Sequence, residues 1–268
     1  MNGPVTARLP YLSRIWQLRY FWFALVVNDL RHRYKRSFLG IGWSLVRPLA
    51  MTCLFCIVFG QLFHLELRDY APHLLIGLTI WQFLTESLNQ GCHCFINGSA
   101  YIRQQQVPLA IFPLRVVLAA TFHLLIALAL ALFVTLYFKG SLNPLALVGL
   151  LPAILLLVCL GWLLAILSGI AHTHFPDTQH VLELGLQFAF YLTPIVYRIE
   201  SLGSRAGLSW LVECNPVTSL LALFRTPIME GTAPAMHHVG VSVLGLVVIG
   251  VLAIPLLRKL ERNLVFWI

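Results

Sequence analysis

Charged side chains are what this sequence has least of. Asp, Glu, Lys and Arg together make up only 10% of its 268 residues, whereas 59% are hydrophobic. A soluble globule of this length needs far more charge to cover its surface. The mean hydropathy of +0.84 instead predicts an all-α membrane protein whose apolar helices cross a bilayer.

Nucleotide-binding and catalytic motifs are also lacking. The three lysines, Lys35, Lys139 and Lys259, are followed by Arg, Gly and Leu, so none completes the Gly-Lys-Ser/Thr turn of a phosphate-binding loop. Glu86 and Glu183 are the only carboxylates expected inside helices, and neither has an obvious His or Arg partner in the sequence. We therefore expect no catalytic residue and no cofactor on this chain, and any ATP and Mg²⁺ would bind to another polypeptide.

Six cysteines are present, but their spacing does not indicate a disulfide framework. The Cys53-Leu-Phe-Cys56 motif lies in an apolar helix without basic groups that would stabilise a thiolate, which favours two packed thiols over a redox pair. Cys92-His93-Cys94 lacks a nearby fourth ligand, and the histidines of segment 172–180 lack a paired ligand spacing. We expect no metal site.

The most informative stretch present is the N-terminal basic region. Apolar residues recur there at steps of four and three, which predicts an amphipathic helix over 16–36 lying in the membrane interface. The residues of this stripe are Trp16, Tyr20, Phe23, Val27, Leu30 and Tyr34. Cations near its end would each contribute about 1 kcal/mol of attraction to anionic phospholipid. Gly40 and Gly42 then offer a joint where the chain can turn into the bilayer, although a simple juxtamembrane anchor fits the same pattern.

Six apolar stretches follow, each close to the roughly 20 residues that span a bilayer. The predicted crossings are 44–64, 72–91, 112–138, 144–171, 181–196 and 239–257, which together form a transmembrane domain over 44–257. Residues 1–43 and 258–268 would be the cytoplasmic N- and C-terminal segments. In the fourth crossing, Gly161, Ala165 and Gly169 are four residues apart, which predicts close packing against a neighbouring helix.

Two segments between crossings are distinctive. Residues 97–108 are polar and glutamine-rich, and we expect a short cytoplasmic helix there that ends at Pro108. In 209–229, Asn215-Pro216 is a cap followed by a first-turn proline, which favours short re-entrant helices over additional crossings in 198–238. Pro194 should kink or end the fifth helix.

The distribution of Lys and Arg sets the orientation. In the six-helix arrangement, 13 of the 18 Lys and Arg residues fall on one side. The five on the other side are Arg68, Lys139, Arg198, Arg205 and Arg225. By the positive-inside rule, both termini are then cytoplasmic.

Several motifs in their order along the chain carry a resemblance to a known family. They are the pattern from Arg33 to Leu49, the loop Phe175–Leu182, the Tyr191-Leu-Thr-Pro-Ile-Val-Tyr197 segment, and Asn215-Pro216 with Arg225 downstream. From about residue 31 to the C-terminus the chain resembles the permease subunits of polysaccharide ABC exporters. That family includes the capsule permease KpsM, the O-antigen permease Wzm and the teichoic-acid permeases.

The resemblance implies a homodimer of six-helix permeases in the bacterial cytoplasmic (inner) membrane, joined to two ABC ATPase subunits. The helix over 16–36 would be the gate helix that presents the phosphorylated end of a lipid-linked polysaccharide. Its headgroup residues would be Arg31, Arg33, Tyr34, Lys35 and Arg36. Segment 97–108 would be the coupling helix that docks on the ATPase through Tyr101, Ile102, Arg103, Gln104, Gln105 and Gln106. Pro194, Asn215, Pro216 and Arg225 would belong to the re-entrant exit elements.

Aromatic side chains can offer flat faces to sugar rings along a conduit, although in membrane helices they also face lipid or the core. The candidates for channel lining are Trp81, Phe83, Phe122, Phe188, Tyr191 and Tyr197. The function expected from all this is export of a lipid-linked polysaccharide. The alternatives are an ABC exporter of a drug or lipid, an intramembrane lipid-modifying enzyme that works without ATP, and a passive channel.

Overall fold

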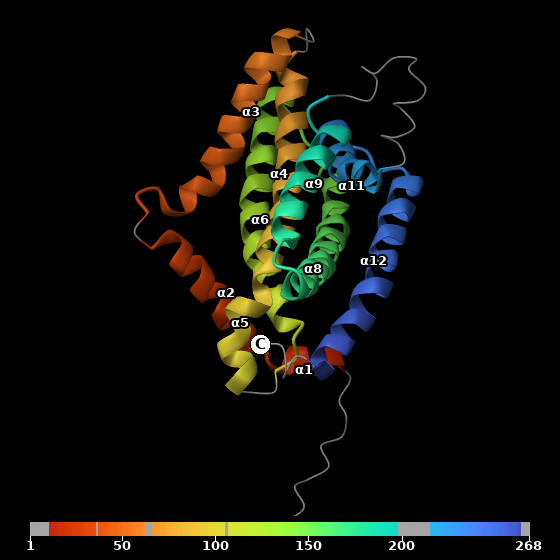
Figure 1. Ribbon diagram of the computed structural model, residues 1–268. Helices are drawn as coiled ribbons and strands as arrows, with labels where there is room; N and C mark the ends of the chain where they lie inside the picture. The colour runs from red at the N-terminus through yellow and green to blue at the C-terminus, as the bar shows by residue number, and fades with distance from the viewer. Residues whose placement is uncertain (1–10, 36, 63–65, 105–106, 198–214, 264–268) are drawn as a thin grey trace, which may run out of the picture.

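The computed structural model describes residues 11–35, 37–62, 66–104, 107–197 and 215–263, and within these ranges every regular element is a helix (Figure 1). The expectation of an all-α protein is therefore confirmed for the described part of the chain. Expectations for Arg36, Gln105 and Gln106, and for segments 1–10, 198–214 and 264–268, lie outside the described residues.

The helices follow the predicted order. They are α1 (Tyr11–Gln17), α2 (Arg19–Tyr34), the 3₁₀ turn η1 (Gly40–Gly42), α3 (Trp43–Leu62), α4 (Leu67–Cys92), α5 (Cys94–Gln104), α6 (Ile111–Lys139), α7 (Pro144–Val148), α8 (Leu150–His174), α9 (Thr178–Leu192), α11 (Pro216–Arg225), the π-helical turn η3 (Thr226–Glu230) and α12 (Met236–Asn263). The helix expected over 16–36 is thus divided, with a break between α1 and α2 at Leu18.

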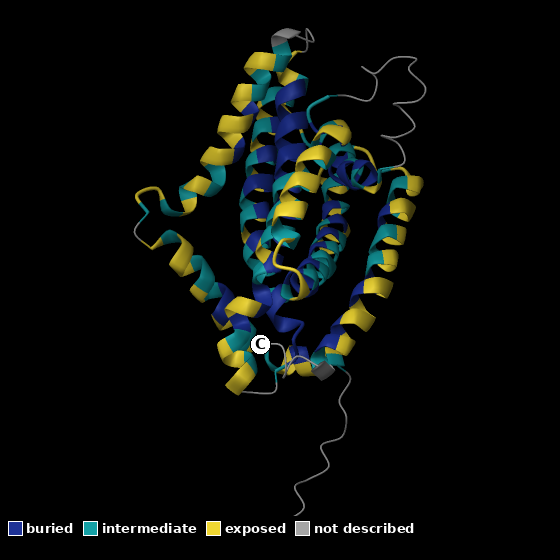
Figure 2. Cartoon of the chain, in the orientation of Figure 1, coloured by how far each residue is buried: buried dark blue, intermediate teal, exposed yellow. Residues whose placement is uncertain are grey.

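Helix α4 forms the centre of the molecule. It packs against α6 and α8 over most of its length and also contacts α3, α9 and α11. Its residues from Tyr70 to Ile80 are all buried, whereas α3, α9 and α12 surround this centre and keep exposed faces (Figure 2). The exposed faces of α3 and α12 are apolar, as at Ile57, Leu244 and Val251, which suits contact with lipid.

Four helical segments among the described residues are long and apolar enough to cross a membrane: Gly40–Gly60, Ile111–Lys139, Pro144–His174 and Met236–Glu261. They match the first, third, fourth and sixth expected crossings. At the second expected crossing, α4 is long enough to span a membrane, but it carries the charged residues Arg68, Asp69 and Glu86. At the fifth, α9 has 15 residues, about 22 Å of helix, which is shorter than the ~30 Å hydrocarbon layer. The count of six crossings therefore stays a prediction.

Small residues bring α8 close to α4, which confirms their predicted packing role. A Cβ added to Gly161 would lie 2.8 Å from the Phe83 ring, and one added to Gly169 would lie 2.8 Å from the Gly91 carbonyl oxygen. Gly91 is the tightest of these positions, because an added Cβ would lie 2.7 Å from the backbone Cα of Ala165.

Replacing Gly91 with alanine should therefore destabilise the protein. The contact is with backbone, so α8 must shift away from α4, and such overpacking costs about 1–3 kcal/mol. Thermal unfolding in detergent would measure the loss. Gly245→Ala is the matched control, since an added Cβ there meets nothing within 4 Å. Equal melting temperatures for the two variants would contradict the tight α4–α8 contact.

The first and last helices meet at one end of the molecule, beside α5 (Figure 1). The Tyr11 hydroxyl donates to Glu261 Oε1 at 2.5 Å, and the Leu109 N–H donates to the same oxygen at 2.9 Å. Burial, reinforced by the Glu261 carboxylate, raises the pKa of Tyr11, so the phenol stays protonated and donates. This contact joins α1, α12 and the segment that leads into α6.

Candidate functional site

The glycine joint predicted between the interfacial helix and the first crossing is present. Gly40 has φ of +51°, a left-handed conformation that a residue without Cβ adopts without strain. From this joint α2 and α3 run toward opposite ends of the molecule, so the two helices form a V whose point faces outward (Figure 1). The joint thus places the end of α2 beside the start of α3.

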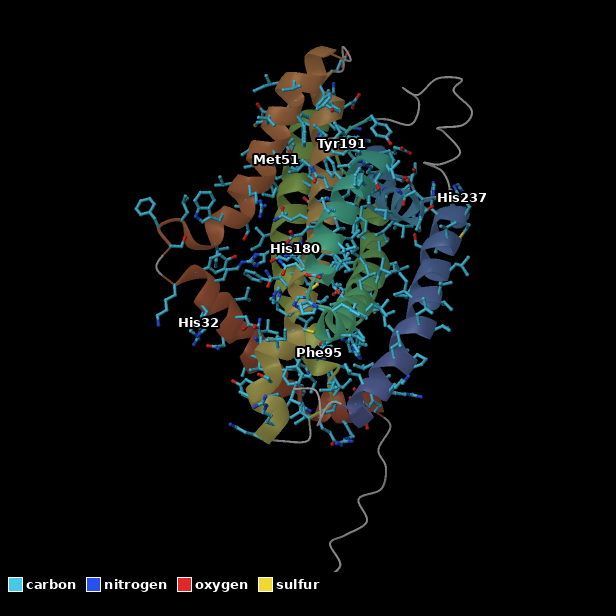
Figure 3. All side chains as sticks on the ribbon, viewed as in Figure 1. His32, Met51, Phe95, His180, Tyr191 and His237 are labelled. Atoms are coloured by element: carbon cyan, nitrogen blue, oxygen red, sulfur yellow. The ribbon has the colours of Figure 1, made fainter. Side chains whose placement is uncertain are left out.

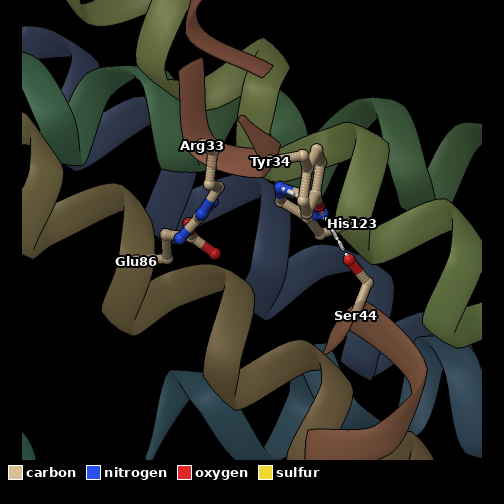
Figure 4. A network of polar contacts seen from close by, with 5 residues as sticks. All are labelled: Arg33, Tyr34, Ser44, Glu86 and His123. Atoms are coloured by element: carbon tan, nitrogen blue, oxygen red, sulfur yellow. Dashed lines mark hydrogen bonds and ion pairs between the residues drawn. The ribbon is translucent and has the colours of Figure 1, made fainter. Parts of the chain in front are cut away.

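A cavity of about 310 Å³ lies inside this V, between α2, α3, α4 and α6. We call it the α2–α3 pocket. Its charged and polar lining includes Arg33, Tyr34, Ser44, Arg47, Glu86 and His123, and five of these are drawn in Figure 4. Polar groups in such numbers are costly in a membrane-embedded protein and usually mark a functional position.

Two ion pairs hold α2 against the helical centre. Arg33 pairs with Glu86 of α4 (Figure 4), and the Glu86 side chain is only 13% exposed. Asp29 Oδ2 accepts from Arg115 Nε of α6 at 2.6 Å. Glu86 therefore has the arginine partner that was not evident from the sequence. Each pair joins residues far apart along the chain, so α2 is fixed to both α4 and α6.

A hydroxyl–imidazole cluster completes the attachment. His123 Nδ1 lies 2.9 Å from the Tyr34 hydroxyl and 2.8 Å from Ser44 Oγ, and the two hydroxyl oxygens are 3.0 Å apart. The three residues come from α6, α2 and the start of α3 (Figure 4). A movement of α2 would therefore have to rearrange both this cluster and the ion pairs.

Ser44 and His123 do not form the core of a hydrolytic triad. A triad needs a carboxylate that orients the imidazole through the ring nitrogen facing away from the serine. Among the described residues, the only hydrogen-bond contact of His123 Nε2 is the Tyr34 hydroxyl, at 3.3 Å. The cluster is therefore better suited to positioning helices than to acyl transfer.

Two of the predicted headgroup cations near the end of α2 do not line the α2–α3 pocket. Arg31 and Lys35 are exposed, and with Phe122 they line a second, open cavity beside α2. His32 lies on the same surface (Figure 3). Of the predicted headgroup residues, Arg33 lines the α2–α3 pocket, Arg31 and Lys35 line the second cavity, and Tyr34 lines both.

Helix α5 places the predicted coupling residues at the same end as α1 (Figure 1). The Tyr101 ring meets Phe21 of α2 edge-on at a centroid distance of 5.7 Å, and Ile102 packs against a buried cluster. Arg103 and Gln104 are exposed. Part of α5 is therefore attached to α2, while its tip remains open to a partner.

The predicted exit elements lie together at the opposite end of the molecule. Arg225 donates from Nη1 to the Pro194 carbonyl oxygen at 2.7 Å, and from Nη2 to those of Ile195 and His73 at 3.1 and 3.3 Å. Gly77 gives the guanidinium room, since a Cβ there would lie 2.5 Å from Nη2.

A second contact joins the same two motifs. Asn215 caps α11 by accepting from the Val217 N–H at 3.0 Å, and its amide donates to Thr193 Oγ1 at 2.9 Å. Pro216 is the first residue of α11, and α9 ends before Pro194. The predicted cap and the predicted helix end are both confirmed. Re-entrant placement in a membrane stays a prediction.

The six aromatic candidates for channel lining do not share one surface. Trp81 and Tyr191 line a groove between α4 and α9. Phe188 is exposed on the outer face of α9, Phe122 lies beside α2, and Tyr197 follows α9. Phe83 is 2% exposed and packs in the helical core.

Sequence reasoning missed His123 and the two ion pairs. His123 is a polar residue in an otherwise apolar stretch of the third predicted crossing, and this was the one available signal. Nothing in the local pattern indicates that Asp29 pairs with Arg115 or that Ser44 approaches His123, because these contacts depend on how the helices pack.

Comparison with known proteins agrees with this architecture. Residues 20–229 match the family model of the ABC-2 type transporter. The chain is 27% identical to the O-antigen export system permease protein RfbA of Klebsiella pneumoniae, over 92% of this chain and 95% of the relative. It is 25% identical to a permease of the same name from Myxococcus xanthus, over 83% and 85%. It is 24% identical to the polysialic acid transport protein KpsM of Escherichia coli, over 78% and 81%.

The chain therefore belongs to the ABC-2 type transporter family of membrane proteins. This confirms the resemblance to polysaccharide export permeases seen in the sequence.

Proposed function

We propose that the chain is the permease subunit of an ATP-driven exporter that moves a lipid-linked polysaccharide of the O-antigen, capsular or teichoic-acid type across the bacterial cytoplasmic membrane. The observation that carries the proposal is the similarity to an O-antigen export permease along 92% of the chain. The permease would work as a homodimer with six crossings per copy and cytoplasmic termini, together with two ATPase subunits that hold ATP and Mg²⁺.

The geometry supports a role for α2 as the gate. The helix is held at a joint and by two ion pairs, and α5 contacts it through Tyr101 and Phe21. Movement of the ATPase subunits would press on α5, shift α2 and change the α2–α3 pocket. The exposed cations Arg31 and Lys35 would then bind anionic phospholipid and the phosphate end of the lipid-linked cargo.

A deletion strain tests the proposal. Without the gene, lipid-linked glycan should accumulate in the cytoplasm and disappear from the cell surface, and the intact gene should restore both. If a drug or lipid accumulates in the deletion strain while the surface glycan is unchanged, the chain would instead belong to an exporter of that drug or lipid.

Arg103→Glu should abolish the ATPase stimulation that depends on the permease, because it reverses the charge of an exposed side chain at the tip of α5, where we propose that the ATPase docks. We expect at least a tenfold loss, a coupling change of about 1.4 kcal/mol, with membrane insertion unaffected. The measurement is ATP hydrolysis by the reconstituted complex. Lys259→Glu is the control, because Lys259 is also exposed but lies on α12. Full stimulation in Arg103→Glu would remove the coupling role from α5.

A further inference from the structure

The turn that leads into α6 takes its hydrogen-bond partners from other helices. Ala110 stands at the N-cap of α6 and provides no side-chain cap, so the N–H groups at this helix end need partners from elsewhere. The Leu109 N–H donates to Glu261 Oε1 of α12 at 2.9 Å, and the Ala110 N–H donates to the Tyr11 hydroxyl of α1 at 3.3 Å. The Ala110 carbonyl oxygen accepts from Trp162 Nε1 of α8 at 3.0 Å. Three helices therefore fix one short turn.

Glu261 is the acceptor on which this arrangement depends. A single carboxylate oxygen, Oε1, accepts from both the Leu109 N–H and the Tyr11 hydroxyl, so it joins the turn to α1 as well as to α12. A carboxylate is also well placed at the start of α6, where the helix dipole is positive. Tyr11 closes the ring of hydrogen bonds, because its oxygen donates to Glu261 and accepts from Ala110. We call Tyr11, Leu109, Ala110 and Glu261 the terminal clasp.

The predicted coupling helix α5 packs directly beside the terminal clasp. Gly98 of α5 lies so close to the buried Phe112 of α6 that an added Cβ would be 2.4 Å from the ring. Ile102 packs against the apolar cluster that includes Leu109 and, from α12, Leu257. Because such close packing transmits displacements, a movement of α5 would be passed to the first turn of α6.

Helix α12 connects this end of the molecule with the predicted exit elements (Figure 1). It begins beside α11, where His238 Nδ1 lies 3.2 Å from Ser219 Oγ, and it reaches the terminal clasp with Glu261. Between these points it packs against α8. A movement of α5 thus has two packed routes, one to α2 through Tyr101 and one to α12 through the clasp.

We propose that the terminal clasp makes the start of α6 and the end of α12 move as one body, so that Glu261 and Tyr11 are positioning residues for energy coupling. The inference rests on the proposed ATP-driven export, in which the ATPase subunits press on α5. With the clasp intact, their movement reaches the exit elements through α12. Without the clasp, the start of α6 shifts while α12 stays in place, and ATP is hydrolysed with less glycan exported.

The amount of glycan exported per ATP hydrolysed tests the proposal in the reconstituted complex. Glu261→Leu should lower this ratio about tenfold, while stimulated ATP hydrolysis continues because the docking tip of α5 is unchanged. Tyr11→Phe removes only the hydroxyl and should lower the ratio about threefold. Glu261→Gln should recover most of the ratio, since its amide oxygen can accept from both donors. Lys259→Leu is the matched control, because Lys259 is exposed on the same helix and takes no part in the clasp.

Hydrogen exchange and melting temperature separate coupling from a purely structural role. Amide exchange in segment 107–112 should be faster in Glu261→Leu, because the Leu109 N–H loses its acceptor. A wild-type ratio of glycan to ATP in Glu261→Leu, or a loss that Glu261→Gln does not recover, would overturn the coupling role. So would a fall in melting temperature with equal losses of export and ATP hydrolysis in both Glu261→Leu and Tyr11→Phe. A wild-type complex that hydrolyses ATP without moving glycan would instead overturn the proposed function.

Discussion

Glu86→Gln should reduce glycan export about tenfold. The change leaves the Arg33 guanidinium without its partner in the α2–α3 pocket. Arg33 is 46% exposed, so the loss of stability should be about 1–2 kcal/mol, below the ~3–5 kcal/mol of a fully buried pair. Export should suffer more than stability, because the pair fixes the position of α2 while the other helices keep their own contacts.

A charge swap provides the control for this prediction. Arg33→Glu and Glu86→Arg should each impair export, whereas the double variant restores the pair with its polarity reversed and should recover most of the activity. Rates of glycan appearance at the cell surface, normalised to the amount of permease in the membrane, would measure this. A double variant no better than its worse single variant would show that the ion pair is not what positions α2.

Arg225→Met should have the second large effect, on folding rather than on transport. The guanidinium donates to the carbonyl oxygens of Pro194, Ile195 and His73. Pro194 and Ile195 lie beyond the end of α9, and each buried acceptor left unpaired there costs about 1–3 kcal/mol. We expect a loss of about 3 kcal/mol or more, seen as a much lower melting temperature in detergent and a reduced amount of permease in the membrane.

Arg258→Met is the matched control for Arg225, because Arg258 is exposed near the end of α12. Arg225→Lys should recover only part of the stability, since an ammonium group cannot span three carbonyl groups as a planar guanidinium does. Wild-type stability in Arg225→Met would mean that the α9 end and α11 are held together by other contacts.

The order and nature of the helices could be predicted from the sequence, because both depend on local properties. Apolar runs of sufficient length predict membrane helices, and the Asn215-Pro216 pair predicts the start of α11 from capping alone. The turn at Gly40 follows from the conformational freedom of glycine. In each case a few neighbouring residues carry all the information.

The arrangement of the candidate site could not be predicted in the same way. The partners Arg33 and Glu86 are separated by α3 along the chain, and His123 meets Ser44 only because α6 and α3 pack side by side. The division between α1 and α2, and the burial of Phe83 in the core, also depend on tertiary packing. Sequence patterns identify which residues are unusual, but the packing decides which of them meet.

Reconstitution in vesicles would test whether the proposed permease moves a glycan with energy from a separate ATPase. The purified permease and its ATPase subunit would be placed in liposomes that contain the lipid-linked glycan on one side, and an added glycosidase would detect glycan on the other. We predict that glycan crosses only when the permease, the ATPase, ATP and Mg²⁺ are all present. Crossing by the permease alone, or no crossing while the assembled complex hydrolyses ATP at its stimulated rate, would show that the chain is not an ATP-driven glycan permease.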